Sequence, residues 1–158
     1  MPLALFRVDD RLVHGQVVIG WGRPLGAQAI VLVDDLVATS SWEQDLYRMA
    51  APQGVGIEFA TTAEAVARLP EWASDPRPII LLTGELEAMA ALQAAHPDLV
   101  SRVNLGGIHY RPGREERLRY LYLDPAEVAL VDAMRARGAV VTAQDLPTSV
   151  GVDAGSLR

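Results

Sequence analysis

The sequence contains no cysteine and no lysine, and these two absences exclude several kinds of chemistry. Without cysteine the chain has no disulfide bond, no thiolate nucleophile and no cysteine-ligated metal. The absence agrees with a reducing, intracellular compartment. All fourteen basic residues are arginine, so a lysine Schiff base and the lysine of a Walker-type phosphate loop are both excluded.

Long apolar runs and an excess of positive charge are also lacking. No apolar run is long enough to span a bilayer. The residues before the first apolar stretch carry no basic group, so we do not expect a signal peptide. A net charge of −6 and a pI of about 5.0 disfavour a general nucleic-acid binder. We therefore expect a soluble protein that is still able to dock on a membrane protein.

The chain has the size and composition of one globular domain. Half of its 158 residues are hydrophobic, which is enough for a substantial core. No internal repeat or low-complexity linker divides it. We therefore expect residues 1–158 to form a single domain.

Apolar runs typical of strands alternate with amphipathic runs typical of helices. Strands are predicted at residues 3–8, 29–33, 54–60, 79–82, 100–105, 120–123 and 139–142. Helices are predicted from near His14, from Ser40 or Ser41 to Ala50, from Thr61 or Thr62 to Leu69, at 85–95, and from Asp124 to Gly138. Residues 108–119 have an irregular, basic pattern, and the tail has no predicted element. The uniformly apolar strands indicate the α/β class, with an open, mostly parallel sheet covered by helices on both faces.

The segment from Phe6 to Val17 is the most informative part of the sequence. The first predicted strand stops at Asp9-Asp10-Arg11, and a helical pattern begins just past His14. In a parallel sheet such a strand-to-helix loop lies at the carboxyl edge, where ligands bind. Backbone N–H groups at the start of a helix favour anions. The loop therefore predicts an anion site, with phosphate as the first candidate.

His14 is the candidate nucleophile of this loop. A free imidazole is largely uncharged near neutral pH, and it can attack phosphorus while Arg11 and loop amides stabilise the phosphate oxygens. Either Asp9 or Asp10 can orient the ring or offset Arg11. A structural salt bridge from one of these aspartates to Arg7 or Arg11 is an equally good interpretation.

Polar residues and glycines follow other predicted strands and are expected at the same edge. Because parallel strands end at one edge, these residues can meet in a crevice beside His14. The alternative is that polar residues and glycines simply terminate strands. The predicted site-lining residues after the other strands are Asp34, Asp35, Thr83, Gly106 and Gly107.

Metal chemistry is the main rival interpretation at this edge. The histidines are too far apart in sequence for a zinc pattern. Asp9, Asp10 and the pair Asp34-Asp35 are able to hold Mg²⁺, but that leaves His14 without a task. Of the other histidines, His96 has the pattern of a helix end, and His109 that of a surface residue near the rim.

The stretch Arg7-Val8-Asp9-Asp10-Arg11-Leu12-Val13-His14-Gly15-Gln16-Val17 resembles the phosphorylation segment of enzyme IIB in the mannose/fructose/sorbose class of the bacterial sugar phosphotransferase system. The resemblance continues at residues 31–38, 50–52, 103–107 and 145–147. It therefore extends over nearly the whole chain.

The resemblance implies that His14 accepts a phosphoryl group, on Nδ1, from a phosphohistidine of a IIA protein. His14 then passes the group to a sugar held by the IIC/IID permease, so the protein is a phosphotransferase located in the cytoplasm at the inner-membrane permease. Arg11 corresponds to the family arginine near the phosphate, and the amides of Gly15 and Gln16 surround its oxygens. The family fold is an open α/β sheet, and no cofactor or metal is implied.

Two alternatives remain open at this stage. The same phosphoacceptor chemistry serves equally well in a regulatory relay without sugar transport. A non-catalytic module that binds an anionic metabolite at the same loop also fits the residues. Because the chain starts directly at its first strand, we expect a free-standing IIB protein without a fused IIA domain.

Overall fold

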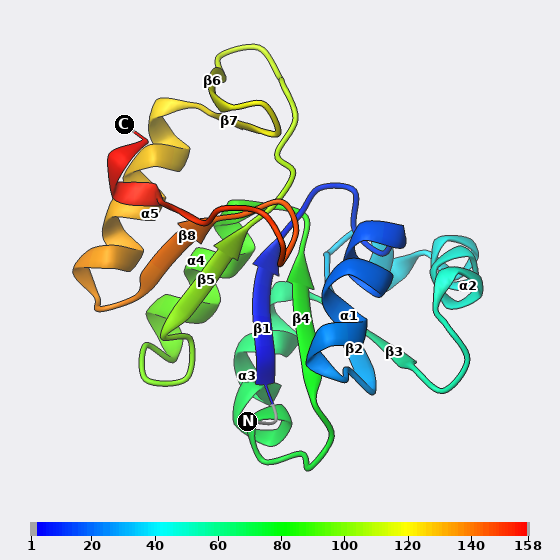
Figure 1. Ribbon diagram of the computed structural model, residues 1–158. Coiled ribbons are helices and arrows are strands. Elements are labelled where there is room, and N and C mark those ends of the chain that lie inside the picture. The colour runs from blue at the N-terminus through cyan, green and yellow to red at the C-terminus, as the bar shows by residue number, and fades with distance from the viewer. Residues whose placement is uncertain (1–2, 158) are drawn as a thin grey trace.

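A computed structural model describes residues 3–157 and shows a central sheet with helices on both faces (Figure 1). Six parallel strands and one antiparallel edge strand follow the order β3-β2-β4-β1-β5-β8-β9. The strands are β1 (Leu3–Val8), β2 (Ala29–Val33), β3 (Gly56–Ala60), β4 (Ile79–Thr83), β5 (Arg102–Leu105), β8 (Val140–Ala143) and β9 (Val152–Asp153). The predicted fold class is confirmed.

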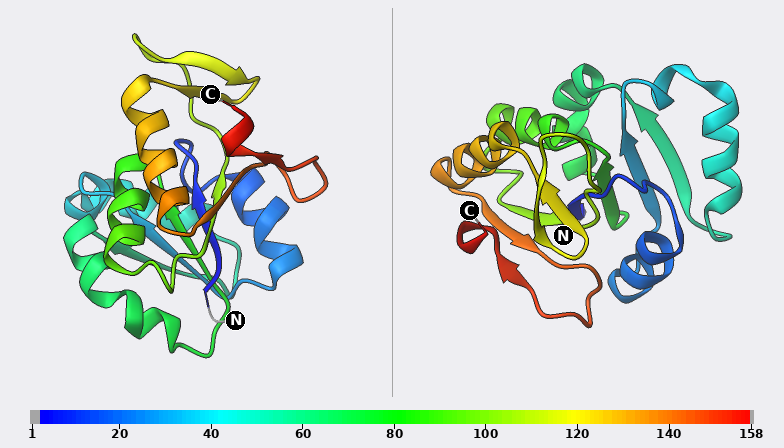
Figure 2. Two further views of the ribbon diagram at one scale, coloured as in Figure 1. Left: turned by 90° about the vertical axis from the view of Figure 1, so that its left-hand side faces the viewer. Right: turned by 90° about the horizontal axis from the view of Figure 1, so that it is seen from above.

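Helical segments connect the strands and form two layers. One face of the sheet is covered by α3, α4 and α5, and the other by η1 and α1 (Figure 2). The segments are η1 (Gln16–Trp21), α1 (Gly22–Leu25), η2 (Val37–Thr39), α2 (Ser41–Ala50), α3 (Thr62–Ala73), α4 (Leu86–Ala95), α5 (Pro125–Ala136) and η3 (Ala154–Ser156).

Strand β1 lies in the middle of the sheet and alternates between the two cores. Phe6 and Val8 join the core under α3, α4 and α5, whereas the intervening Arg7 points to the opposite face. Neighbouring β4 and β5 pair with β1 on its two sides. The carboxyl end of β1 therefore lies between the loops that follow β4 and β5.

The helix caps expected from the sequence form at the starts of α3 and α5. Thr61 and Glu64 make a reciprocal capping box at α3, and Asp124 and Glu127 make another at α5. Each box satisfies two backbone N–H groups that the helix start leaves without partners.

The structure differs from the predicted elements in several places. Helix α3 continues through Pro70 to Ala73 instead of ending at Leu69. Pro70 has no N–H to donate to the carbonyl of Val66, and His96 Nε2 lies 2.6 Å from that carbonyl instead. The segment 108–119 is not wholly irregular, since it contains β6 (Glu115–Leu118). β6 pairs with β7 (Leu121–Leu123) in a separate antiparallel hairpin, so the predicted strand 120–123 lies outside the main sheet. The tail forms β9 against β8.

Helix α2 has an exposed apolar face. Trp42, Leu46 and Met49, which the sequence places on one side of the helix, are all exposed. The helix lies beside the edge strand β3 and not over the sheet (Figure 1).

The connection between β1 and β2 also differs from the single helix predicted there. It begins with η1, a six-residue π-helical segment, and α1 follows directly.

Candidate functional site

The loop after β1 is held at the carboxyl edge by backbone hydrogen bonds to its two neighbours. Asp9 N–H donates to the carbonyl of Thr83 at 2.9 Å, and Asp10 N–H donates to the carbonyl of Gly107 at 2.8 Å. Leu12 then adopts a φ of 60°, in the left-handed region that branched residues rarely occupy. Its side chain is buried in the core under η1, which holds this turn in place. The loop is therefore built into the sheet edge.

Asp9 is the centre of the site and is fully buried. Its Oδ2 accepts a hydrogen bond from Arg7 Nη2 at 3.2 Å and one from Arg11 Nη2 at 2.9 Å. Its Oδ1 accepts from Arg11 Nε at 3.0 Å and from the Arg11 backbone N–H at 3.1 Å. The salt bridges that the sequence left as an alternative therefore exist, and Asp9 forms both of them.

The arginines keep Asp9 ionised in spite of its burial. Burial alone raises the pKa of the Asp9 carboxyl, but hydrogen bonds from His14 and Arg11 and the charges of Arg7 and Arg11 outweigh it, so the pKa lies well below its ordinary value. Burial lowers the pKa of Arg7, and Asp9 opposes this change. Burial also acts to lower the pKa of Arg11, but the hydrogen bond to Asp9 raises it overall.

His14 lies next to Asp9 and just before η1. Its Nε2 points inward and lies 3.5 Å from Asp9 Oδ1, while 21% of the side chain is exposed. Its carbonyl accepts the N–H of Val18 at 2.9 Å, which fixes the backbone at the start of η1. The next residue, Gly15, is exposed and has open space around it. The imidazole is therefore at an accessible turn. The side chain of Gln16 lies outside the described part of the structure.

Gly106 and Gly107 make room for the buried charges. A Cβ on Gly106 would clash with the guanidinium of Arg7 and lie 2.7 Å from Asp9 Oδ2. A Cβ on Gly107 would lie 3.0 Å from Arg11 Nε and 3.3 Å from Asp9 Oδ1. Real Cβ atoms essentially never come closer than 3.0 Å to such neighbours. The two glycines therefore allow the loop after β5 to pack directly on the Arg7–Asp9–Arg11 cluster.

Asp10 faces away from this cluster and binds the loop after β5. One carboxylate oxygen accepts the backbone N–H of His109 at 2.7 Å, and the other lies 2.5 Å from its ring Nδ1. The ring of His109 is largely exposed. His109 thus borders the loop that carries His14, closer to the site than a general surface position.

Asp34, Asp35 and Thr83 lie at the same edge but outside the Asp9 network. Asp34 Oδ1 accepts the N–H groups of Leu36 and Val37, and Asp35 Oδ1 accepts the N–H of Thr62. The Thr83 hydroxyl donates to the carbonyl of Glu85 at 3.0 Å. Asp34 and Asp35 line a separate hollow of about 400 Å³. Gly84 lies between Asp34 and Leu12 of the loop after β1, because a Cβ on it would be 3.6 Å from Asp34 Oδ2 and 2.8 Å from Leu12 Cδ2.

The four aspartates proposed for a magnesium site do not converge. Asp9 binds arginines, Asp10 binds His109, and the other two carboxylates bind backbone amides. Among residues 3–157, no three histidine, aspartate or glutamate side chains gather in a way that would hold a metal ion. The four carboxylates therefore do not form one site.

The sequence pattern places Asn104 at the carboxyl edge of the sheet, but it does not predict that Asn104, Gln144 and Asp145 hold Arg7. Arg7 Nη1 donates to Asn104 Oδ1 and to the carbonyl of Gln144, and Nη2 donates to the carbonyl of Asp145 at 2.9 Å. The guanidinium lies 4.9 Å from the ring centroid of Trp21, whose indole N–H donates to the same Asp145 carbonyl at 3.0 Å. The Asp145 carboxylate also lies 3.4 Å from Arg11 Nη2. Arg7 sits in an apolar run, so only its charge could have marked it.

A model of the PTS system sorbose subfamily IIB component matches residues 3–157, almost the full chain. The chain belongs to this family. The resemblance noted in the sequence is therefore confirmed, and the chain is a phosphotransferase enzyme component of sugar uptake. IIB components of this system act together with IIA and with IIC/IID components.

Relatives and solved structures agree with this assignment to the IIB family. The N-acetylgalactosamine-specific phosphotransferase enzyme IIB component 1 of Escherichia coli K12 is 32% identical over 146 residues, which cover 92% of this chain and 91% of that protein. The crystal structure of the N-acetylgalactosamine-specific IIB component 1 from E. coli superposes with a TM-score of 0.88 at 29% identity, covering 96% of this chain and 98% of that one. The mannose-specific EIIAB component of E. coli K12 is 27% identical over 87% of this chain and 42% of that protein.

As a IIB protein, the chain places one imidazole over a buried carboxylate and beside a partly exposed guanidinium. Arg11 has 28% of its side chain exposed, so it is able to contact an oxyanion next to His14 while its other face binds Asp9.

Within residues 3–157, no helix has the length and apolar character needed to cross a bilayer.

Proposed function

We propose that residues 1–158 act as one phosphocarrier domain in which His14 accepts a phosphoryl group from a phosphohistidine of a IIA protein. The observation that supports this most directly is the position of His14, partly exposed over the ionised Asp9 and next to Arg11. Because Nε2 faces Asp9, Nδ1 is the nitrogen that attacks phosphorus. The P–N bond to the donor histidine breaks as the P–N bond to Nδ1 forms.

Arg11 and the first amides of the helical segment stabilise the oxygens of the transferred group. The guanidinium supplies charge, and the N–H groups of Gly15 and Gln16 supply hydrogen bonds where a helix start leaves them without intrahelical partners. Asp9 keeps both Arg11 and the imidazole in place. Asp10, Gly106 and Gly107 hold the loop, whereas Asp34, Asp35 and Thr83 shape the neighbouring rim.

The second half of the proposed function is transfer to a sugar at the membrane. The protein remains in the cytoplasm, docks on a IIC/IID permease, and gives the phosphoryl group to the sugar bound there. This requires no cofactor in the protein itself. The sugar is selected by the permease, so the N-acetylgalactosamine specificity in the relatives' names does not by itself define the substrate of this chain.

A labelling experiment tests the phosphoacceptor role. Incubation with a phosphorylated IIA donor should give the wild type an acid-labile, base-stable phosphate, and His14→Ala should stay unlabelled. His96→Ala is the matched control, because His96 caps the far end of α4 and binds the carbonyl of Val66. Labelling of His14→Ala, or no covalent label on the wild type, would overturn the proposal and favour a module that only binds anions.

Transfer from the labelled protein separates transport from regulation. Adding a permease in membrane vesicles together with its sugar should remove the phosphate from the protein and produce sugar phosphate. If the label stays on the protein under these conditions while IIA still loads it, the regulatory alternative is the better description.

A further inference from the structure

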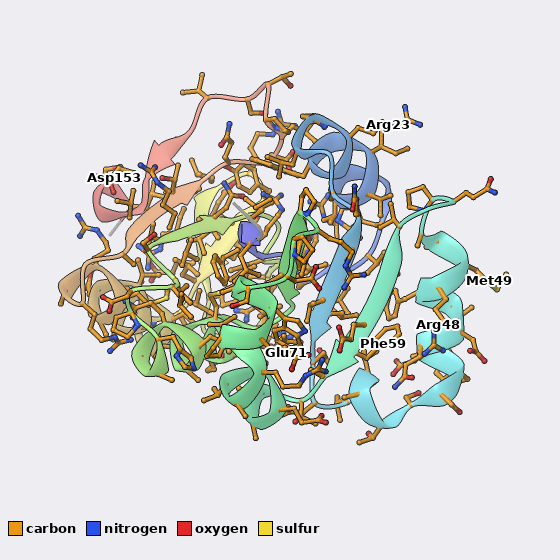
Figure 3. The ribbon with its side chains drawn as sticks, turned by 90° about the horizontal axis from the view of Figure 1, so that it is seen from below. Arg23, Arg48, Met49, Phe59, Glu71 and Asp153 are labelled. Carbon is orange, nitrogen blue, oxygen red and sulfur yellow. The ribbon has the colours of Figure 1, made fainter. Side chains whose placement is uncertain are left out.

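Helix α2 presents a stripe of large apolar side chains to the outside of the molecule. Trp42, Leu46 and Met49 recur at helical spacing and are 66%, 53% and 81% exposed. No residue of α2 is buried. Figure 3 shows Met49 on the side of the helix away from β3. Contiguous exposed apolar side chains of this size mark interaction surfaces. We call these three residues the α2 stripe.

The opposite side of α2 fixes its orientation. Arg48 lies over the ring of Phe59 on β3, 5.1 Å from its centroid (Figure 3). Gln44 Nε2 donates to the carbonyls of Val37 and Ala38 at 2.9 and 3.1 Å. Tyr47, one turn from Gln44, also packs against the core under η1. The helix therefore turns Gln44, Tyr47 and Arg48 toward the protein, and the α2 stripe faces outward.

An acidic hollow lies next to the segment that precedes α2 in the chain. Leu36, which is 78% exposed, precedes α2 and lines the hollow of about 400 Å³ at the carboxyl edge. Four carboxylates and one guanidinium line the same hollow, so its charge is strongly negative; the residues are Asp34, Asp35, Glu85, Glu87 and Arg111. A partner of the α2 stripe that also reaches this hollow must be apolar along one side and basic at one end.

We propose that the α2 stripe and the acidic hollow anchor this protein to a basic, amphipathic cytoplasmic segment of the sugar permease; this rests on the proposed function. Cytoplasmic loops of membrane proteins carry an excess of lysine and arginine, which complements the hollow. A second copy of this chain would bring an identical acidic hollow and a net charge of −6, which opposes such pairing. The same net charge opposes binding to an anionic lipid surface.

The location of α2 distinguishes this anchor from the donor contact. The IIA donor must cover His14 after β1, whereas α2 lies beside β3, three strands away in the sheet order. At the usual strand spacing this is about 14 Å. The α2 stripe therefore lies apart from His14, whereas the acidic hollow, which Glu85 after β4 also lines, lies closer to the loop that carries His14. A permease segment held on the stripe raises the effective concentration of the phosphoryl group at the permease.

The test measures binding and loading of the same variants. The variant Trp42→Gln/Leu46→Gln/Met49→Gln removes the α2 stripe, and exposed positions tolerate such changes with little loss of stability. Val140→Gln, at a half-exposed position on β8, is the matched control. Binding is measured to nanodiscs that hold a mannose-class IIC/IID permease from the same genome, and to empty nanodiscs of the same lipid.

We expect the triple variant to bind permease nanodiscs about tenfold or more weakly than wild type, whereas Val140→Gln binds normally. Both variants should accept phosphate from IIA at the wild-type rate. Wild-type binding should weaken as salt rises, and Glu87→Arg should weaken it further. These results together support the anchor.

Four outcomes would overturn it. Unchanged permease binding by the triple variant removes the stripe from the interface, and slower loading by IIA assigns the stripe to the donor. Binding to empty nanodiscs assigns it to lipid, and a wild-type dimer that the triple variant dissociates assigns it to a second copy. Absence of any phosphate on wild-type His14 instead refutes the proposed function, whatever the binding result.

Discussion

Asp9 shows how a single buried side chain organises the site. It lies between Arg7, which is fully buried, and Arg11, which reaches the surface. Removing one member of such a buried cluster leaves an uncompensated charge, which costs about 3–5 kcal/mol. The same carboxylate faces Nε2 of His14. Stability and the position of the reactive ring therefore depend on the same residue.

Gly106→Ala tests the close packing on this cluster. The added methyl group overlaps the Arg7 guanidinium, so we expect a loss of about 1–3 kcal/mol in the free energy of unfolding. Phosphate acceptance should fall as well, because Asp9 is displaced with Arg7. Urea denaturation and labelling by IIA measure both effects.

Gly56→Ala is the matched control, since a Cβ there meets nothing closer than 3.9 Å. It should leave stability unchanged or slightly higher. If Gly106→Ala and Gly56→Ala had the same unfolding free energy and the same labelling by IIA, the close packing of Gly106 on Arg7 would not matter for stability or phosphate acceptance.

Sequence reasoning could find the site residues that are neighbours in the chain. Asp9, Arg11 and His14 are recognisable because charged residues interrupt an apolar pattern at a strand end. Asn104 is recognisable as a polar residue at a strand end, but its contact with Arg7, and that of Asp145, could not be found this way. Their contact with Arg7 depends on how β5 and the segment after β8 pack on β1, which no local pattern contains.

At the scale of elements, one buried ion pair connects the β6–β7 region to α5. Arg114 donates from Nε and Nη2 to the two carboxylate oxygens of Glu127, both at 2.8 Å, and from Nη1 to the carbonyl of His109. Glu127 also completes the capping box at the start of α5. The pair therefore positions the loop that contacts Asp10.

Glu127→Gln keeps the size of the side chain and removes its charge. We expect a loss of about 3 kcal/mol in unfolding free energy, because the buried Arg114 loses the carboxylate at 2.8 Å and keeps only that of Glu85, 4.0 Å from its Nη2. Thermal and urea denaturation measure it. Glu116→Gln, at an exposed position on β6, should change stability by less than about 0.5 kcal/mol. A comparable loss in both variants would contradict the assigned role of the pair.

The sequence predicted long elements well and short ones poorly. Buried parallel strands such as β2 and β4 are continuous apolar runs, and their pattern needs no tertiary information. β6 and β9 are short and charged or polar, and they form only because a partner strand lies beside them. The side that α2 turns toward the protein was also not predictable, because contacts of Gln44, Tyr47 and Arg48 with other elements decide it.

For the whole molecule, the lowered pKa of Asp9 makes stability depend on pH. Between its ordinary value of 3.8 and its lower folded value, the unfolded chain binds a proton that the folded chain does not. The contribution of Asp9 is therefore complete above about pH 4 and is lost as the pH falls further. The loss for this one group is at most about 1.4 kcal/mol per pH unit.

Unfolding free energies measured from pH 6 to pH 2.5 for wild type and Asp9→Asn check this dependence. Asp9→Asn should be less stable at pH 6, and the difference from wild type should shrink below pH 4. Other carboxylates with lowered pKa values, such as that of Asp75 at about 2, act equally in both proteins and cancel in the comparison. If the difference in unfolding free energy stayed constant down to pH 2.5, the pKa of Asp9 would not be lowered in the folded protein.

The contact between His14 and Asp9 has a consequence for the electronic form of the ring. A neutral imidazole exists as two tautomers, and in free solution it exchanges between them. Here the ionised carboxylate beside Nε2 favours the tautomer with its hydrogen on that nitrogen, which leaves the lone pair on Nδ1. The fold thereby prepares the nucleophilic electron pair before any donor arrives.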